Sequence, residues 1–175
     1  MSVLSDLQFD MLSGEVDNMN SFELLENEAC EEGVDIVGYD FRSDRIRGLY
    51  CDGTVAISNT INTITEKTTV LAEELGHYHT TSGNILDQTD VSNRKQERHA
   101  RFWAYDKLIG LSGIIKGFEN GCRSRYELAE FWGVTEEFLQ DALDCYESKF
   151  GSYIRVGEYM ITFIPTLIVI KKLNT

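Results

Sequence analysis

The dipeptide Asp52-Gly53 constrains the fold of this chain most, because it lies between two β-type runs within residues 45–59. Asp-Gly is a preferred pair for the two-residue turn of a β-hairpin. We therefore predict a hairpin over residues 45–59. Residues 34–41 alternate like a further strand. The first third of the chain is thus expected to hold a small antiparallel sheet.

Helical patterns dominate the rest of the chain. Apolar residues recur at helical spacing in four predicted helices: 20–33, 64–80, 93–111 and 124–149, the last broken at Gly133. At the first helix, Asn20 and Glu23 have the spacing of a capping box, and Gly33 stands where a C-terminal glycine belongs. Thr65 is the expected cap of the second helix.

These elements predict an α+β fold with a helical core, a small antiparallel sheet and a C-terminal β-hairpin, which we place in residues 152–172 with a turn near Gly157. The length of 175 residues suits one domain with a small extension. We expect residues 1–115 to form the domain that carries the site. Residues 116–175 are then a helical segment plus the hairpin, packed on the same domain.

The charge and the apolar pattern narrow the classes of partner. The formal net charge is −13, so the chain is a poor candidate for binding nucleic acid or an anionic membrane surface. The longest apolar stretch, residues 160–170, is too short to span a bilayer. The first residues lack a basic region and a long apolar run, so we expect no signal peptide.

The cysteines point to a reducing compartment. None of the four forms a C-x-x-C pair, which argues against a thiolate zinc cluster. We expect reduced, mostly buried thiols and a cytoplasmic protein. The four residues are Cys30, Cys51, Cys122 and Cys145.

The chemistry is concentrated in the second predicted helix. Glu73 and His77 have i, i+4 spacing, so both side chains lie on one helix face. In the pattern H-E-x-x-H, two such residues hold a metal and the glutamate between them is the general base. Glu74 occupies the base position, and Glu73 replaces the first histidine. A carboxylate binds Zn²⁺ at roughly 2.0–2.2 Å, but its charge also favours Mn²⁺ or Fe²⁺.

Glu97 is the candidate third ligand. It lies on the same helix face as Ala100 and Ala104, and a carboxylate that points at a core needs a partner. A metal would supply that partner, but Arg101 at i+4 would supply one too. Glu73 and Glu74 have the simpler interpretation of surface acids, and His77 that of a satisfied histidine at a helix end.

Two further histidines are reserve ligands. His79 is two residues from His77, and His99 is two residues from Glu97, so each is turned away from the predicted site on its helix. Both remain in reserve for the case that Glu73 does not bind the metal.

Residues 126–139 have the pattern of a helix-turn-helix, with Ala129, Gly133 and Val134 at the tight turn. The second helix is acidic, through residues such as Glu136 and Glu137. We therefore interpret this unit as a packing or protein-recognition element and not as a DNA reader.

The run GLYCDGTVAISNTINTITEKTTVLAEELGHYHT, residues 48–80, resembles the ImmA/IrrE family of metallopeptidase domains, common in phages and mobile elements. Residues 97–104 resemble the family's E-x-x-A-x-x-[FW]-A segment. The resemblance implies a zincin-like fold. It also implies that Glu74 is the base and that His77 and Glu97 are metal ligands.

The resemblance further implies a function, because relatives in this family cleave or inactivate a partner repressor. We expect a zinc endopeptidase that acts on a helix-turn-helix repressor, with the metal held by Glu73, His77 and Glu97. A second hypothesis is a non-catalytic module that binds and inactivates a repressor or other protein, which Glu73 in place of histidine favours. A third is a phage structural protein whose motifs are fortuitous.

Overall fold

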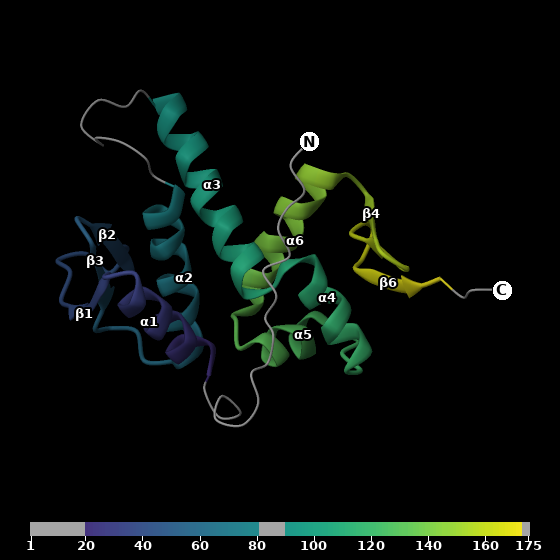
Figure 1. Ribbon diagram of the computed structural model, residues 1–175, viewed down its shortest axis with the longest axis horizontal. Helices are drawn as coiled ribbons and strands as arrows, with labels where there is room; N and C mark the ends of the chain where they lie inside the picture. The colour runs from purple at the N-terminus through teal and green to yellow at the C-terminus, as the bar shows by residue number, and fades with distance from the viewer. Residues whose placement is uncertain (1–19, 81–89, 173–175) are drawn as a thin grey trace.

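A computed structural model describes residues 20–80 and 90–172. The elements are α1 (Ser21–Glu31), β1 (Asp35–Tyr39), β2 (Gly48–Cys51), β3 (Thr54–Ser58), α2 (Ile64–Thr80), α3 (Asp90–Leu108), α4 (Gly110–Glu119), α5 (Arg125–Trp132), α6 (Glu136–Phe150), β4 (Tyr153–Val156), β5 (Tyr159–Thr162) and β6 (Ile168–Lys171) (Figure 1). The fold is α+β, as predicted.

The first sheet has the strand order β1-β3-β2, so β2 is an edge strand. β2 and β3 form the predicted hairpin, and Asp52 and Gly53 at its turn have φ values of 48° and 76°. β1 instead pairs parallel with β3, from Asp35 opposite Thr54 onwards. The sheet is therefore mixed, with an antiparallel hairpin and one parallel pair.

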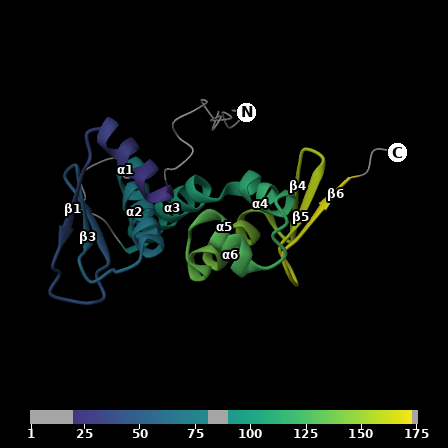
Figure 2. The ribbon, with the colours of Figure 1, turned by 90° about the horizontal axis from the view of Figure 1, so that it is seen from below.

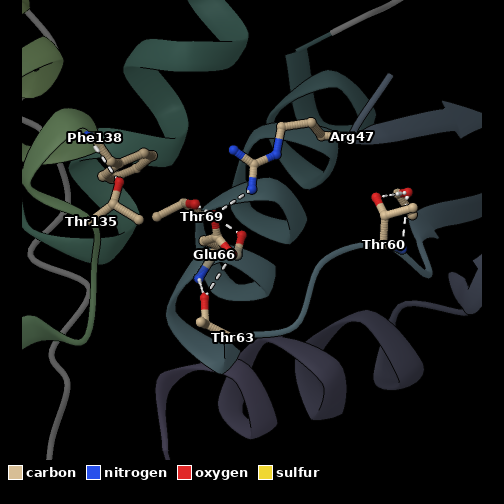
Figure 3. A network of polar contacts seen from close by, with 8 residues as sticks. Arg47, Thr60, Thr63, Glu66, Thr69, Thr135 and Phe138 are labelled. Carbon is tan, nitrogen blue, oxygen red and sulfur yellow. Dashed lines mark hydrogen bonds and ion pairs between the residues drawn. The ribbon is translucent and has the colours of Figure 1, made fainter. Parts of the chain in front are cut away.

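The helix ends show how local side chains define the elements. Asn20 Oδ1 accepts from the Glu23 N–H at 3.1 Å and Glu23 Oε2 accepts from the Asn20 N–H at 3.0 Å, which confirms the predicted capping box. At α2 the prediction of Thr65 as cap is wrong. Thr63 Oγ1 accepts from the Glu66 N–H at 3.2 Å, one residue before the helix begins (Figure 3).

The segment predicted as one helix over 93–111 is two helices, since α3 ends at Leu108 and α4 begins at Gly110. Gly110 has a φ of 60°, which an α-helix interior does not accommodate. The predicted break at Gly133 is confirmed, with a φ of 62° between α5 and α6.

The core joins α2 to the first sheet on one side and to α3 on the other. Leu71 and Leu75 of α2 are almost fully buried, as is Val55 of β3. Gly76 permits the close crossing of α2 and α3, because a Cβ there would lie 2.3 Å from the carbonyl oxygen of Ala100. This crossing places the last turns of α2 against the first half of α3.

The C-terminal strands form a second sheet of order β4-β5-β6, antiparallel throughout. The predicted hairpin is thus its first pair, and β6 adds a third strand. Ile161 and Val169 are buried on the side facing the helices. The two sheets lie at opposite ends of the long axis of the molecule (Figures 1 and 2).

Two expectations from composition can be compared with the structure. The four cysteines are free, but Cys30 and Cys51 are exposed, so the prediction of mostly buried thiols is wrong. Among the described residues, no helix combines the length and the apolar character that crossing a bilayer requires.

Candidate functional site

Glu74 lies where α2 faces the edge strand β2. Its Oε2 accepts a hydrogen bond of 2.7 Å from the Tyr50 N–H, a backbone group of that strand. Gly48 of the same strand leaves room for the contact, since a Cβ there would lie 2.6 Å from Val70 and 2.8 Å from Glu74. The hairpin therefore holds this carboxylate through the Tyr50 N–H. The absence of a side chain at Gly48 permits the close approach of α2.

The surroundings of Glu74 raise its pKa to about 7. Burial is the largest cause, and the hydrogen bond from Tyr50 opposes it. The nearby carboxylates of Glu73 and Glu97 raise the pKa further. A carboxyl group with a pKa near neutrality suits a general base, because it can take up and release a proton at the working pH.

Glu73 is half-buried on the same helix. Burial is again the first cause that raises its pKa, and Arg101 opposes it while Glu97 adds to it. Asp141 of α6 raises the pKa of Glu73 further, and Arg47 lowers it.

His77 and Glu97 meet directly across this crossing. His77 Nε2 lies 3.3 Å from Glu97 Oε2, and Arg101 Nε lies 2.7 Å from the other carboxylate oxygen, Oε1. Of the two partners that the sequence left open for Glu97, a metal or Arg101, the structure shows Arg101 on one oxygen, and His77 approaches the other. Glu97 is shared between the histidine and the arginine.

Carboxylates and an imidazole at this crossing are ligand types that bind divalent metals. The distance between the ligand atoms of His77 and Glu97 also fits such an ion. Two ligand atoms on a tetrahedral zinc are roughly 3.4 Å apart, given bond lengths of about 2.1 Å. The 3.3 Å between His77 and Glu97 matches that value. Within the described part of the chain, the ligand atoms of Glu73, His77 and Glu97 do not all lie within 4.8 Å of one another. A three-ligand site therefore requires these ligand atoms to come closer together than they lie here.

A second cluster lies between the last turn of α2 and helix α1. The ligand atoms of Glu28, Glu32 and His79 all lie within 4.8 Å of one another. His79 Nε2 is 3.3 Å from Glu32, and Glu28 forms an ion pair of 2.5 Å with Lys107. The imidazole of His79 also stacks on Trp103, with 4.4 Å between ring centroids. Lys107 thus already balances one of the two carboxylates of the cluster.

The sequence reasoning did not find this cluster. Glu28 and Glu32 have i, i+4 spacing on a predicted helix, which was the one available signal. Nothing local shows that this helix packs beside the end of α2. Of the two reserve ligands, His79 belongs to this cluster, whereas His99 is exposed on α3.

The position of α2 between the edge strand β2 and the crossing helix α3 agrees with the metallopeptidase-like domain that the sequence resemblance implies. The chain belongs to the family of IrrE N-terminal-like domains, a peptidase family, which it matches over residues 29–144. A search of the curated proteins found no match. The match confirms the resemblance to the ImmA/IrrE family. The division at residues 115 and 116 stays a prediction.

Proposed function

We propose that this protein is a metal-dependent endopeptidase that cleaves a partner repressor of helix-turn-helix type, encoded by a phage or mobile element. The observation that carries the proposal is the geometry of Glu74. This half-buried carboxylate has a pKa of about 7, is held by the Tyr50 N–H, and lies within a turn of His77. Membership of a peptidase family supports the reaction class.

The residues that would hold the metal are Glu73, His77 and Glu97. Zn²⁺ is the ion that we propose, with Mn²⁺ or Fe²⁺ as alternatives that a carboxylate-rich site accepts. When bound, such an ion polarises the scissile carbonyl and lowers the pKa of water. Arg101 donates to one oxygen of Glu97 and leaves the other oxygen facing His77.

The protein's own part in the reaction is proton transfer. Glu74 takes the proton of the attacking water and passes it to the leaving amine. The Tyr50 N–H holds Oε2 of this carboxylate, and Oε1 lies beside Gly48 of the same strand, where a Cβ would be 2.8 Å away. Exchange of that proton requires little energy near pH 7, because the pKa of the group lies there.

A second candidate is a non-catalytic module that binds and inactivates a repressor or other protein. Glu73 in place of histidine favours it, as does the hold of Arg101 on Glu97 at 2.7 Å. In both proposals this chain acts in the cytoplasm on a protein partner and does not itself contact nucleic acid or membrane.

The two candidates differ in whether new N-termini arise in a partner. The test adds zinc-loaded wild-type protein to a lysate of its host and detects new N-termini by N-terminal labelling and mass spectrometry. We expect a new N-terminus in a helix-turn-helix protein. Glu74→Gln should lower this cleavage at least ~100-fold, the usual size of a lost general base. A chelator should also abolish it. Equal cleavage by Glu74→Gln would contradict the mechanism, and retention of a partner without cleavage would support the binding module.

A further inference from the structure

A recess of about 520 Å³ opens where the first turn of α2 meets the corner between α5 and α6. Ala129 and Val134 are buried at its floor. Its walls include Tyr126 and Glu130 of α5 and Glu136 of α6. This corner is the acidic helix-turn-helix-like unit of the sequence, to which the peptidase proposal assigns no role.

Local sequence signals define both ends of α5 at this corner. Ser124 caps α5 with a capping box, and Gly133 ends it in the left-handed region, which turns the chain directly into α6. Tyr126 and Glu130 are four residues apart and lie on one face of α5. The Tyr126 hydroxyl donates to Glu130 Oε1 at 2.7 Å, and 55% of the tyrosine remains exposed. The aromatic ring is thus held in position at the surface.

Two carboxylates line the recess, those of Glu130 and Glu136. No ion pair within residues 20–80 and 90–172 involves Glu130 or Glu136. The hydrogen bond to Glu130 raises the pKa of Tyr126, and the nearby carboxylate of Glu136 adds to the rise. An exposed aromatic ring beside two carboxylates attracts a cation by its π face and by direct charge.

We propose that this recess binds a lysine or arginine side chain of a protein partner. A cationic side chain would pack its alkyl part on the apolar floor and place its charge between Tyr126, Glu130 and Glu136. Duplex DNA is repelled by the same carboxylates, so the corner recognises protein. The proposal does not depend on peptidase activity. Glu74 lies nine residues beyond Thr65 of the recess, roughly 13 Å along α2.

The simplest competing explanation is that Glu136 only stabilises the N-terminus of α6. Acidic residues in a first helical turn are favourable to the helix dipole. Glu136 and Glu137 share that turn, but Glu136 alone of the two lines the recess. Comparing Glu136→Gln with Glu137→Gln therefore separates the recess from the dipole and from net charge.

The test uses the full chain and an acetylated and amidated hexa-arginine peptide as probe. Titration calorimetry measures the Kd, and changes in amide chemical shifts locate the binding site. We expect Glu136→Gln and Tyr126→Leu each to raise Kd at least ~fivefold more than Glu137→Gln does. Shifts should centre on residues 126–136, and Glu74→Gln should bind like wild type. Equal weakening by Glu136→Gln and Glu137→Gln, or shifts spread over the surface, would overturn the proposal. Binding of a DNA duplex at the same corner would overturn it too.

Discussion

At the scale of single residues, Glu73 and Glu74 are chemically identical neighbours with different surroundings. Glu74 contacts the backbone of β2, whereas Glu73 faces the charges of Arg101 and Glu97 on α3. The pKa of both is raised, and burial is the first cause in each case. The sequence predicted that Glu73 shares a helix face with His77, because helical spacing is local. It could not predict the hydrogen bond from Tyr50, which depends on how the hairpin packs on α2.

The raised pKa of Glu74 predicts a pH-dependent stability of the metal-free protein. The folded state binds the proton of Glu74 more tightly than the unfolded state, with a pKa of about 7 against 4.5. The free energy of unfolding should therefore fall as pH rises from 4.5 to 7. Glu74→Gln removes this loss, so its advantage over wild type should grow from near zero at pH 4 to roughly 3 kcal/mol at pH 8.

Urea unfolding with a chelator, from pH 4 to 8, measures this difference. Glu137→Gln is the control, because that residue is exposed. Parallel curves for wild type and Glu74→Gln would show that the carboxyl group titrates normally.

At the scale of elements, the site depends on the close crossing of α2 and α3. Gly76 and Ala100 make that approach, and His77 and Glu97 flank it. Local patterns predicted both helices. They did not predict α4, the parallel pairing of β1 or the third strand β6. Each of these depends on contacts between segments distant in sequence, or on a single glycine conformation such as that of Gly110.

Gly76→Ala should open this crossing. The added Cβ would lie 2.3 Å from the Ala100 carbonyl oxygen, so the helices must separate. Overpacking of this kind costs about 1–3 kcal/mol, which exceeds the gain of up to about 1 kcal/mol in helix propensity. We expect a net loss of about 1–2 kcal/mol in chemical denaturation. Ser148→Ala, at an exposed helical position, is the control and should change stability little.

A separation of α2 from α3 should also move His77 away from Glu97. Gly76→Ala is therefore expected to bind zinc more weakly than wild type even under conditions where it is fully folded. Wild-type stability together with wild-type zinc affinity would contradict the role given to this crossing.

At the scale of the whole molecule, three acidic groupings lie at separate places. The Glu74 site lies between β2 and α3, the Glu28 cluster lies between α1 and the end of α2, and the recess lies at the α5–α6 corner. Some of the acidic residues behind the net charge of −13 thus lie in distinct environments. Composition predicted poor affinity for nucleic acid, but not these locations, because they are set by tertiary packing.

The presence of two histidine-containing carboxylate groups makes the position of the metal the central question. The Glu74 site has the proposed base and the geometry between His77 and Glu97. In the other group, Lys107 and Trp103 already engage Glu28 and His79. We therefore expect metal at the first group and not at the second.

Metal content by elemental analysis tests this claim most directly, on protein purified without chelator and after zinc reconstitution. The prediction is about one ion per chain in wild type, lost in Glu97→Ala and kept in Glu32→Gln. Glu97→Ala should remain folded by circular dichroism, since Glu97 is half-exposed. Metal that is lost in Glu32→Gln but kept in Glu97→Ala would place the ion in the α1 cluster. No metal in reconstituted wild type would contradict the peptidase account and leave the binding module.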